Sequence, residues 1–376
     1  MNKLIELKNL GQSVWYDNIE RKLLQNGELK RLIDEDGITG VTSNPSIFEK
    51  AITSSGDYDA DIKALAKAGK SAEQIYEEIT VKDIIGACDL LDKTCQDSKQ
   101  CDGYVSIEVS PDYAYDVEKT LVAARRIFKA VNRPNVLIKV PGTTEGFEAS
   151  RQLIFEGINI NITLLFSQND FVEAAGAYIK GLKKRLDRGL GIADVFSVAS
   201  VFISRIDTKI DDMLKKMIDE RTQMKDSNLS SSLSHLSSLT GKSAVANAKI
   251  IHHLHKKLFG GKDFSSLQEQ GAKPQKIVWA STSAKNPAFP DTKYVDELIA
   301  PDTINTIPTQ TLFAFKDHGK PKISMKNNGS KAQETIMQLR ESGINITTIC
   351  DGIKCDGVKS FAEAYKKALA AIAGKI

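Results

Sequence analysis

Short apolar segments alternate with helix-like segments along most of the chain, and this alternation constrains the fold more than any other feature. Eight of the apolar segments predict β-strands, because β-branched residues are frequent in them and turn residues bound them. They cover residues 13–17, 38–42, 103–110, 136–140, 158–167, 195–207, 275–283 and 302–309. Strands that alternate with helices pair in parallel, and eight such units are the number that closes a barrel.

The sequence therefore predicts an α/β protein, a (β/α)8 TIM barrel formed by residues 1–376 as a single domain. The alternative is an open doubly wound sheet, but its usual glycine-rich GxGxxG turn is absent after the first predicted strand. Residues 43–46 are expected to form a turn. Helical periodicity predicts helices at 18–37, 116–131, 147–156 and 170–188, and at least two more within 57–99.

Two regions fall outside the repeat. Residues 211–271 form a long insertion between the sixth and seventh predicted strands, and its serine-rich stretch at 227–239 is expected to be a lid, a helix cap region or a mobile loop. Residues 330–376 follow the eighth strand and predict two further helices. We expect this extension to cap one face of the barrel or, alternatively, to contact a second copy of the chain.

Composition and charge restrict the class of protein. A hydrophobic fraction of 41% and a charged fraction of 26% are typical of globular proteins that work in water. The net charge of +3 over 376 residues indicates no nucleic acid partner and no membrane surface partner. The first residues carry charges at Lys3, Glu6 and Lys8, so we expect neither a secretion signal nor a membrane span, and a cytoplasmic location.

The cysteines and histidines do not predict a metal site. The five cysteines include no CxxC pair, so they are expected to be reduced thiols and not a disulfide framework or a zinc site. His252, His253 and His255 lie close together, but they occupy one helix-like run with no second ligand motif. A helix face explains them better than a metal.

One of the predicted strands carries a lysine among apolar residues. Lys139 interrupts the run from Val136 to Val140, which has the composition of a strand buried on both faces. A lysine in that position pairs with an acid, reaches water, or reacts, because desolvation favours the neutral amine that forms Schiff bases with carbonyl compounds. From this run alone, a structural lysine in a salt bridge remains a full alternative.

Polar residues gather where the predicted strands end, and the active site of a barrel enzyme is built at the C-terminal ends of its strands. Those residues are Asp17, Thr42, Asn44, Glu108, Lys139, Asn161, Thr163, Ser200, Arg205, Ser281 and Ser283. Acids, an amine and amides together suit carbonyl chemistry. Each also has a structural explanation: Asp17 as a helix cap, Glu108 as the neutralising partner of Lys139, and Asn44 as a turn residue before proline.

Five ordered motifs resemble one family. VTSNPSIF, SIEVSPDYA, VLIKVPGT, INITLLFS and SVFISRID are similar to the motifs of the transaldolases, class I Schiff-base enzymes of the pentose phosphate pathway. WASTSAKNP and YVDELIAPDTINTIP resemble the longer bacterial subgroup. The resemblance implies transfer of a dihydroxyacetone unit from sedoheptulose 7-phosphate to glyceraldehyde 3-phosphate. It implies small sugar phosphates as partners and no metal or organic cofactor.

The resemblance also implies catalytic roles. Lys139 would form the Schiff base, and Asp17 would take the hydroxyl proton whose loss breaks the carbon–carbon bond. Glu108 with Thr163 would hold the water used to form and hydrolyse the imine.

Further residues would bind the sugar. Asn44 and Asn161 would hydrogen-bond the dihydroxyacetone hydroxyls, with Thr42 and Ser200 supporting them. In the related fructose-6-phosphate aldolases, glutamine and tyrosine tend to stand where this chain has Glu108 and Phe202. These two residues therefore follow the transferase pattern.

Phosphate recognition departs from the family pattern. Arg205 matches the first phosphate-binding arginine, but the second, expected just after Ser281, is replaced by the sequence TSAK at 282–285. Ser281, Ser283 and Lys285 are the candidates to replace it, although a lysine binds phosphate as a point charge and not as a two-pronged donor.

Three hypotheses follow from these residues: a transaldolase, an aldolase that releases dihydroxyacetone to water, and a catalytically silent barrel. Asp17, Glu108 and Lys139 are all present, which argues against the silent barrel. The sequence leaves the oligomeric state open between a monomer and a homodimer.

Overall fold

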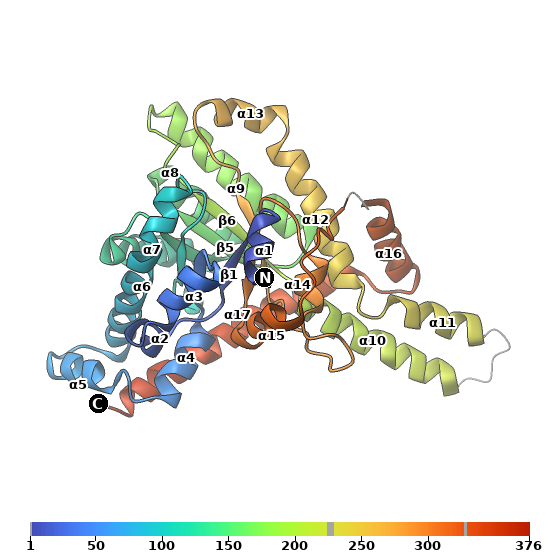
Figure 1. Cartoon of the computed structure of the whole chain (residues 1–376), viewed down its shortest axis with the longest axis horizontal. Helices are drawn as coiled ribbons and strands as arrows, with labels where there is room; N and C mark the ends of the chain where they lie inside the picture. Colours follow the sequence, from blue (N-terminus) through green and yellow to red (C-terminus); the bar gives the residue numbers. More distant parts are fainter. Residues whose placement is uncertain (1, 224–228, 327–328) are drawn as a thin grey trace.

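The strands close into the predicted barrel. The computed structural model describes residues 2–223, 229–326 and 329–376 (Figure 1). Its strands are all parallel and pair in chain order, with β8 closing against β1. They are β1 (Gln12–Tyr16), β2 (Gly40–Thr42), β3 (Val105–Glu108), β4 (Val136–Pro141), β5 (Ile160–Leu165), β6 (Ser197–Phe202), β7 (Lys276–Ala280) and β8 (Thr303–Ile307). The prediction of a (β/α)8 barrel is confirmed.

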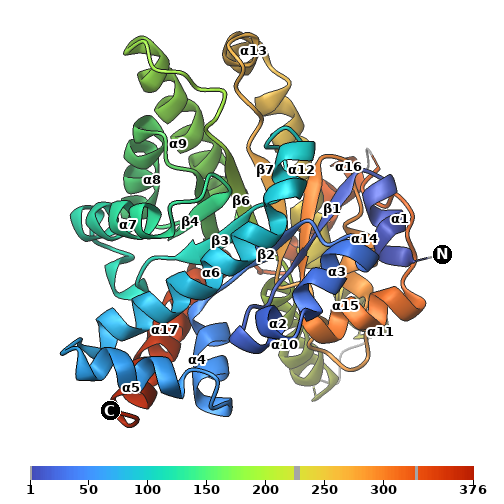
Figure 2. The same cartoon turned by 60° about the vertical axis from the view of Figure 1, so that its left-hand side comes forward.

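Helices surround the strands on the outside of the barrel (Figures 1 and 2). In the first half of the chain they are α1 (Lys3–Asn9), α2 (Arg21–Gln25), α3 (Glu28–Asp36), α4 (Pro45–Ser54), α5 (Asp59–Lys67), α6 (Ala72–Asp97), the 3₁₀ turn η1 (Pro111–Tyr113), α7 (Val117–Val131), α8 (Thr144–Glu156) and α9 (Gln168–Asp187). In the second half they are α10 (Ser204–Gln223), α11 (Leu229–Leu239), α12 (Ser243–Phe259), α13 (Lys262–Glu269), α14 (Lys293–Glu297), α15 (Thr309–His318), α16 (Gly329–Glu341) and α17 (Ile346–Ala373). None of the described helices is both long and apolar enough to cross a lipid bilayer.

The strand register sets the position of the reactive residues. Glu108 on β3 pairs with Lys139 on β4, and Lys139 pairs with Asn161 on β5. Residues paired in register on neighbouring strands lie side by side and point to the same face of the sheet. The backbone ladder therefore places an acid, an amine and an amide in one row near the C-terminal end of the barrel.

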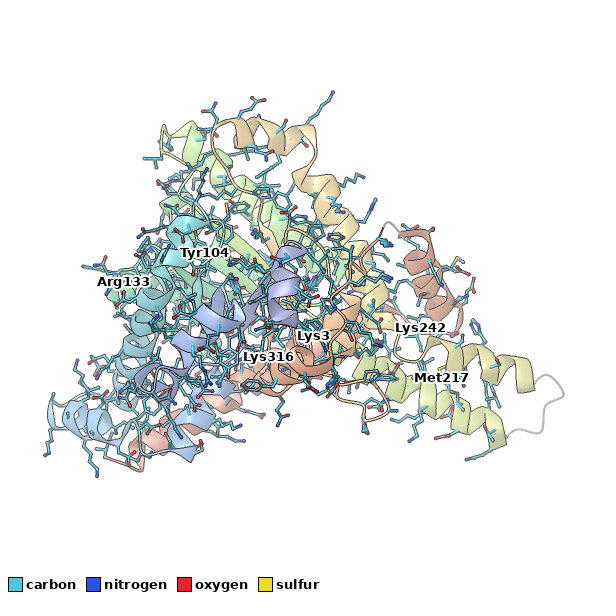
Figure 3. All side chains as sticks on the ribbon, in the orientation of Figure 1. Lys3, Tyr104, Arg133, Met217, Lys242 and Lys316 are labelled. Atoms are coloured by element: carbon cyan, nitrogen blue, oxygen red, sulfur yellow. The ribbon has the colours of Figure 1, made fainter. Side chains whose placement is uncertain are left out.

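The opposite end of the barrel is closed by aromatic packing. Tyr104, labelled in Figure 3, stacks on Phe196 with ring centroids 4.5 Å apart, just before β3 and β6 begin. Asp102 accepts a hydrogen bond of 2.8 Å from Trp15 Nε1 in the same region. With this end filled by side chains, the C-terminal ends of the strands are left for a site.

Three predicted elements were wrong in detail. The sixth strand was expected to run to residue 207, but β6 ends at Phe202 and α10 begins at Ser204. The apolar residues Ile206, Ile210 and Leu214 are buried at a spacing of four, which is helical and not strand-like. The helix expected at 18–37 is two helices, because Gly27 takes a positive φ of 74° between them. The expected turn at 43–46 opens α4, with Pro45 in the first helical turn.

The described residues of the insertion at 211–271 are mostly helical. The insertion contains most of α10 followed by α11, α12 and α13, and α10 and α11 extend side by side away from the barrel (Figure 1). The serine-rich stretch forms α11 from Leu229 onward, and residues 227–228 lie outside the described residues. The expectation of a mobile loop is therefore wrong for residues 229–239, and the expectations of a lid or a helix cap region stay predictions.

The long helix α17 crosses the C-terminal ends of the strands. It packs against α4, α6, α10 and η1, and Figure 2 shows it passing beside α4 and α6. This is the position expected of a cap over the barrel face. The alternative contact with a second copy stays a prediction.

Candidate active site

A cavity of about 170 Å³ lies at the C-terminal ends of the strands. It brings together nine of the predicted residues: Asp17, Thr42, Asn44, Lys139, Ser200, Phe202, Arg205, Ser281 and Ser283. Glu108, Asn161 and Thr163 are absent from its lining and lie behind it. Five residues that the prediction did not name complete the wall: Ser46, Ala280, Thr306, Pro308 and Phe361, together with Lys285.

Lys139 is buried at the inner end of this cavity. Its Nζ donates a hydrogen bond of 3.1 Å to the backbone oxygen of Ser43 and lies 3.4 Å from Glu108 Oε2. The ring of Phe361, from α17, lies 5.9 Å from the same nitrogen and covers it. The Lys139 amine is therefore held in place between the Glu108 carboxylate and the Phe361 ring.

The carboxylate of Glu108 is buried and lacks hydrogen-bond donors among the described residues. Its side chain is 2% exposed, and the contact with Lys139 has an ion-pair distance without the angles of a hydrogen bond. Among the described residues, no group donates a hydrogen bond to either Glu108 oxygen, and Thr163 Oγ1 is likewise buried without a partner. Buried acceptors without a partner next to the reactive amine are consistent with a place for a small hydrogen-bonding molecule such as water. The alternative in which Glu108 only neutralises Lys139 leaves these acceptors unexplained.

Asp17 lines the cavity just after the end of β1. Its Oδ1 accepts a hydrogen bond of 2.7 Å from Thr42 Oγ1, and Thr42 is in turn 2.6 Å from Thr306 Oγ1 on β8. The structural alternative for Asp17 was a helix cap, but the residue at the start of α2 is Glu20. Asp17 is thus oriented by strand residues toward the cavity.

Burial raises the pKa of both acids. For Asp17, desolvation outweighs the opposing effects of Lys139, the Thr42 hydrogen bond and Lys285. For Glu108, desolvation and the nearby Asp17 charge outweigh the attraction of Lys139. Each carboxylate therefore takes up a proton more readily than an exposed acid does, which suits a group that accepts and returns protons.

Two amides lie at the cavity, with Asn44 in its lining and Asn161 behind it. Asn44 is the N-cap of α4, where its Oδ1 accepts hydrogen bonds from Ser46 N and Ile47 N, so its amide nitrogen is the end that remains for a ligand. Asn161 donates to Ser106 Oγ at 3.0 Å and accepts from Ser200 Oγ at 2.7 Å. Asn44 thus has a structural role as a helix N-cap and is also part of the cavity lining.

The outer part of the cavity is basic. Arg205 lies in the first turn of α10, and burial lowers its pKa, an effect that Asp356 offsets only in part. Its guanidinium lies 5.7 Å from the Phe202 ring. A Cβ at Gly357 would come within 3.3 Å of Arg205 Nη1, so the glycine lets α17 pass close to this side chain. Lys285 contributes a second positive charge from the exposed mouth.

The backbone is irregular beside the site. Leu164, next to Thr163, and Ser281 have φ values of 58° and 56°, which only a few per cent of non-glycine residues adopt. The β5–β6 register also shifts between Ile162 and Leu165. Such irregularities are common where a strand turns a side chain toward a site.

The histidines and cysteines lie elsewhere. His255 on α12 is buried, with its Nε2 2.8 Å from the Gln275 backbone oxygen and its ring between Phe171 and Phe259. In the part of the chain that the structure describes, no three His, Cys, Asp or Glu residues are grouped as a metal site. All five cysteines are free.

Known proteins share both the motifs and the length of this chain. The family model described as Transaldolase/Fructose-6-phosphate aldolase matches residues 14–372. The chain is 42% identical to a transaldolase of Trichodesmium erythraeum, an alignment that covers all of this chain and 98% of that relative. It is 42% identical to transaldolase 2 of Nostoc sp. with the same coverage, and 39% identical to the transaldolase of Neisseria gonorrhoeae over 98% of this chain and 99% of that relative. The chain therefore belongs to the transaldolase/fructose-6-phosphate aldolase family.

Proposed function

We propose that this protein transfers a dihydroxyacetone unit from sedoheptulose 7-phosphate to glyceraldehyde 3-phosphate, giving erythrose 4-phosphate and fructose 6-phosphate. The observation that carries the proposal is the Lys139 amine, buried in the cavity 3.4 Å from Glu108 Oε2 and close enough to Asp17 to affect that residue's pKa. The full-length similarity to proteins named transaldolase supports the reaction class. We place the reaction in the non-oxidative pentose phosphate pathway of the cytoplasm.

The first step is Schiff-base formation. Lys139 Nζ attacks the C2 carbonyl as the neutral amine, after its proton passes to Glu108 or to solvent. The resulting carbinolamine loses its oxygen as water and becomes an iminium. Glu108 and Thr163 hold this water, since their side-chain oxygens are buried acceptors without a partner among the described residues.

The second step breaks the carbon–carbon bond. Asp17 takes the proton of the C4 hydroxyl, the electron pair of the C3–C4 bond moves into the iminium, and an aldehyde leaves. The bound three-carbon enamine persists because the iminium nitrogen is an electron sink and the amides of Asn44 and Asn161 hold its hydroxyls. Thr42 orients Asp17, and Ser200 orients Asn161. The acceptor aldehyde then adds by the reverse of these steps.

A transaldolase passes the bound enamine to an acceptor aldehyde, whereas a simple aldolase releases it to water as dihydroxyacetone. Glu108 and Phe202 follow the transferase pattern, and Phe361 covers the amine from above. We expect little release of dihydroxyacetone when fructose 6-phosphate is supplied without an acceptor, and rapid turnover once erythrose 4-phosphate is added. A coupled assay with and without acceptor tests this. Cleavage at comparable rates in both conditions would instead identify an aldolase.

The acid limb of the pH profile should reflect the raised pKa of Asp17. Catalysis needs the Asp17 carboxylate, so kcat/KM should fall as pH drops through a pKa above the ordinary value of 3.8. Because the raised pKa means that the folded state binds the extra proton, Asp17 and Glu108 favour folding at low pH, and this contribution is lost as pH rises through their raised values. Activity should therefore disappear before the fold does. Parallel pH titrations of rate and circular dichroism measure both, and coincident transitions would contradict the assignment.

We assign the sugar phosphate group to Arg205, with Ser281, Ser283 and Lys285 in place of a second arginine. Arg205→Ala should raise KM for fructose 6-phosphate by about 10–100-fold, the effect of losing a charge-assisted bidentate contact. Lys285→Met should raise it less, because Lys285 is exposed. Fructose, the same ketose without its phosphate, is the control donor, with unphosphorylated glyceraldehyde as the acceptor, and both variants should use it as well as the wild type does. An equal loss with that donor would show a structural effect.

A further inference from the structure

A second and larger cavity, of about 420 Å³, lies on the other side of Glu108. It is enclosed by α6, the end of β3, η1, the C-terminal part of α7 and the far end of α17. Thr80, Ser110 and Tyr365 are among the residues that line it. It opens to solvent on the α6 side, where the lining residues Glu73, Gln74 and Glu78 are exposed.

An ion pair forms part of the wall between the two cavities. Glu108 lines the larger cavity and is absent from the lining of the sugar cavity, whereas Lys139 lines the sugar cavity and is absent from that of the larger one. The two side chains meet with Nζ and Oε2 3.4 Å apart. Glu108 is therefore the residue that lines the larger cavity and also contacts the Lys139 nitrogen.

The Glu108 carboxylate is the polar group that points to a ligand in this cavity. It is 98% buried, and in the described part of the chain it accepts no hydrogen bond. The Tyr76 ring, on the facing wall, is near enough for the Glu108 charge to contribute to the raised pKa of its hydroxyl. Glu108 lines this cavity while its carboxylate oxygens are buried just behind the wall, and at this size the cavity has room for roughly a dozen waters.

Specific contacts between helices hold the walls of this cavity in fixed positions. Tyr76 meets Tyr365 edge to face, with ring centroids 5.0 Å apart. Arg126 on α7 forms two hydrogen bonds with Glu77 on α6, of 2.7 and 2.6 Å. These contacts tie α6 to α7 and α17, so the space between them is supported and not a loose gap.

We propose that this cavity is a separate water route to the Schiff base, an inference that rests on the function proposed above. Imine formation removes the ketose C2 oxygen as one water, and imine hydrolysis adds one water to C2 as the C–N bond breaks. No oxidation or reduction is involved. While a sugar phosphate fills the smaller cavity and its phosphate group occupies the mouth, water cannot pass that way. The Glu108 side is the remaining approach to the imine, and it lies away from Asp17, where the carbon–carbon chemistry takes place.

The proposed water route can be narrowed by substitutions in two different walls of the larger cavity. Thr80→Phe on α6 and Ser110→Phe at the end of β3 both add a ring to the cavity, and neither residue touches the sugar cavity. Thr335→Phe is the matched control. Thr335 donates to the backbone oxygen four residues earlier, as Thr80 does, but lines a separate cavity of about 220 Å³ between α12 and α16.

The measurement is the amount of solvent oxygen that enters C2 of fructose 6-phosphate per turnover in ¹⁸O-labelled water, corrected for spontaneous exchange. In the wild type and in Thr335→Phe, water from solvent should hydrolyse nearly every imine. In Thr80→Phe and Ser110→Phe, the water released during imine formation should stay trapped and be reused in hydrolysis. Label per turnover should then fall by about tenfold, the effect expected if exchange of this water with solvent is about tenfold slower. Because label is divided by turnover, a partial loss of folded enzyme does not change the ratio.

Wild-type label per turnover in a folded Thr80→Phe or Ser110→Phe variant would overturn the water route. If both variants also formed the normal borohydride adduct on Lys139, the proposed function would stand without it. If the wild type formed no adduct on Lys139, the proposed function itself would fail. Reduced label in the Thr335→Phe control would likewise overturn the inference, since that cavity does not border Glu108.

Discussion

A Lys139→Met variant is expected to lose transfer activity by at least about 10⁴-fold, because covalent catalysis by the amine has no substitute in the cavity. Methionine keeps the unbranched apolar stem of the side chain under Phe361 and lacks the terminal amine. It removes the charge that Glu108 faces, so Glu108 should take up a proton and remain buried as a neutral acid. Borohydride added with fructose 6-phosphate should fix a three-carbon adduct on Lys139 of the wild type and none on the variant.

Lys285 provides the matched control for this experiment. It is the other lysine that lines the same cavity, so it is the alternative amine for a Schiff base. Lys285→Met should retain the adduct at saturating donor, and peptide mapping should place that adduct on Lys139. An adduct on Lys285, or no adduct in the wild type, would contradict the mechanism. Circular dichroism on each variant separates loss of chemistry from loss of fold.

Asp17→Asn is expected to lower kcat by about 10²–10⁴-fold, the usual contribution of a positioned general base, with little change in donor binding. The amide has the size of the carboxylate and its oxygen can still accept from Thr42 Oγ1, but it cannot take a proton. Imine formation does not need Asp17 in the proposed mechanism. Borohydride should therefore trap the whole six-carbon sugar on Lys139 of this variant, where the wild type yields the three-carbon fragment.

Asp207→Asn is the control for burial alone. Asp207 on α10 is also a buried acid with a raised pKa, and it accepts hydrogen bonds from Ala244 N and Tyr294 Oη outside the cavity. This variant should still yield the three-carbon adduct, whatever its effect on stability. Equal amounts of three-carbon adduct in Asp17→Asn and wild type would remove Asp17 from the cleavage step.

The barrel and most of the cavity could be predicted because both depend on local sequence. A β-branched run and the polar residue at its end are neighbours in the chain, so Lys139, Asp17 and Asn44 could be located once the strands were recognised. The end of β6 was misplaced because the apolar residues continue into α10, and only their spacing of four distinguishes the helix from the strand.

The residues that the prediction missed come from parts of the chain with no local signal. Thr306 faces Thr42 only because β8 closes against β1, and closure is a property of all the strands together. Phe361 and Gly357 reach the site from α17, whose apolar residues predict a buried helix but not which side chain covers Lys139. Ser106 was identified as strand interior, and its hydrogen bond to Asn161 depends on the register across three strands. Long-range register and packing are not encoded in any single segment.

The pairing of Glu108, Lys139 and Asn161 on adjacent strands has a consequence for how this site can vary. Neighbouring strands lie about 4.8 Å apart, and the ladder of main-chain hydrogen bonds holds that interval regardless of side chain. The distances between the acid, the amine and the amide are thus set by the pairing of the strands and not by loops or by substrate. Insertions such as α10 to α13 can lengthen, shorten or change partners without altering the spacing between these strands. New donor preferences should therefore be sought by altering the loops and α17 above the row, with the three strands left untouched.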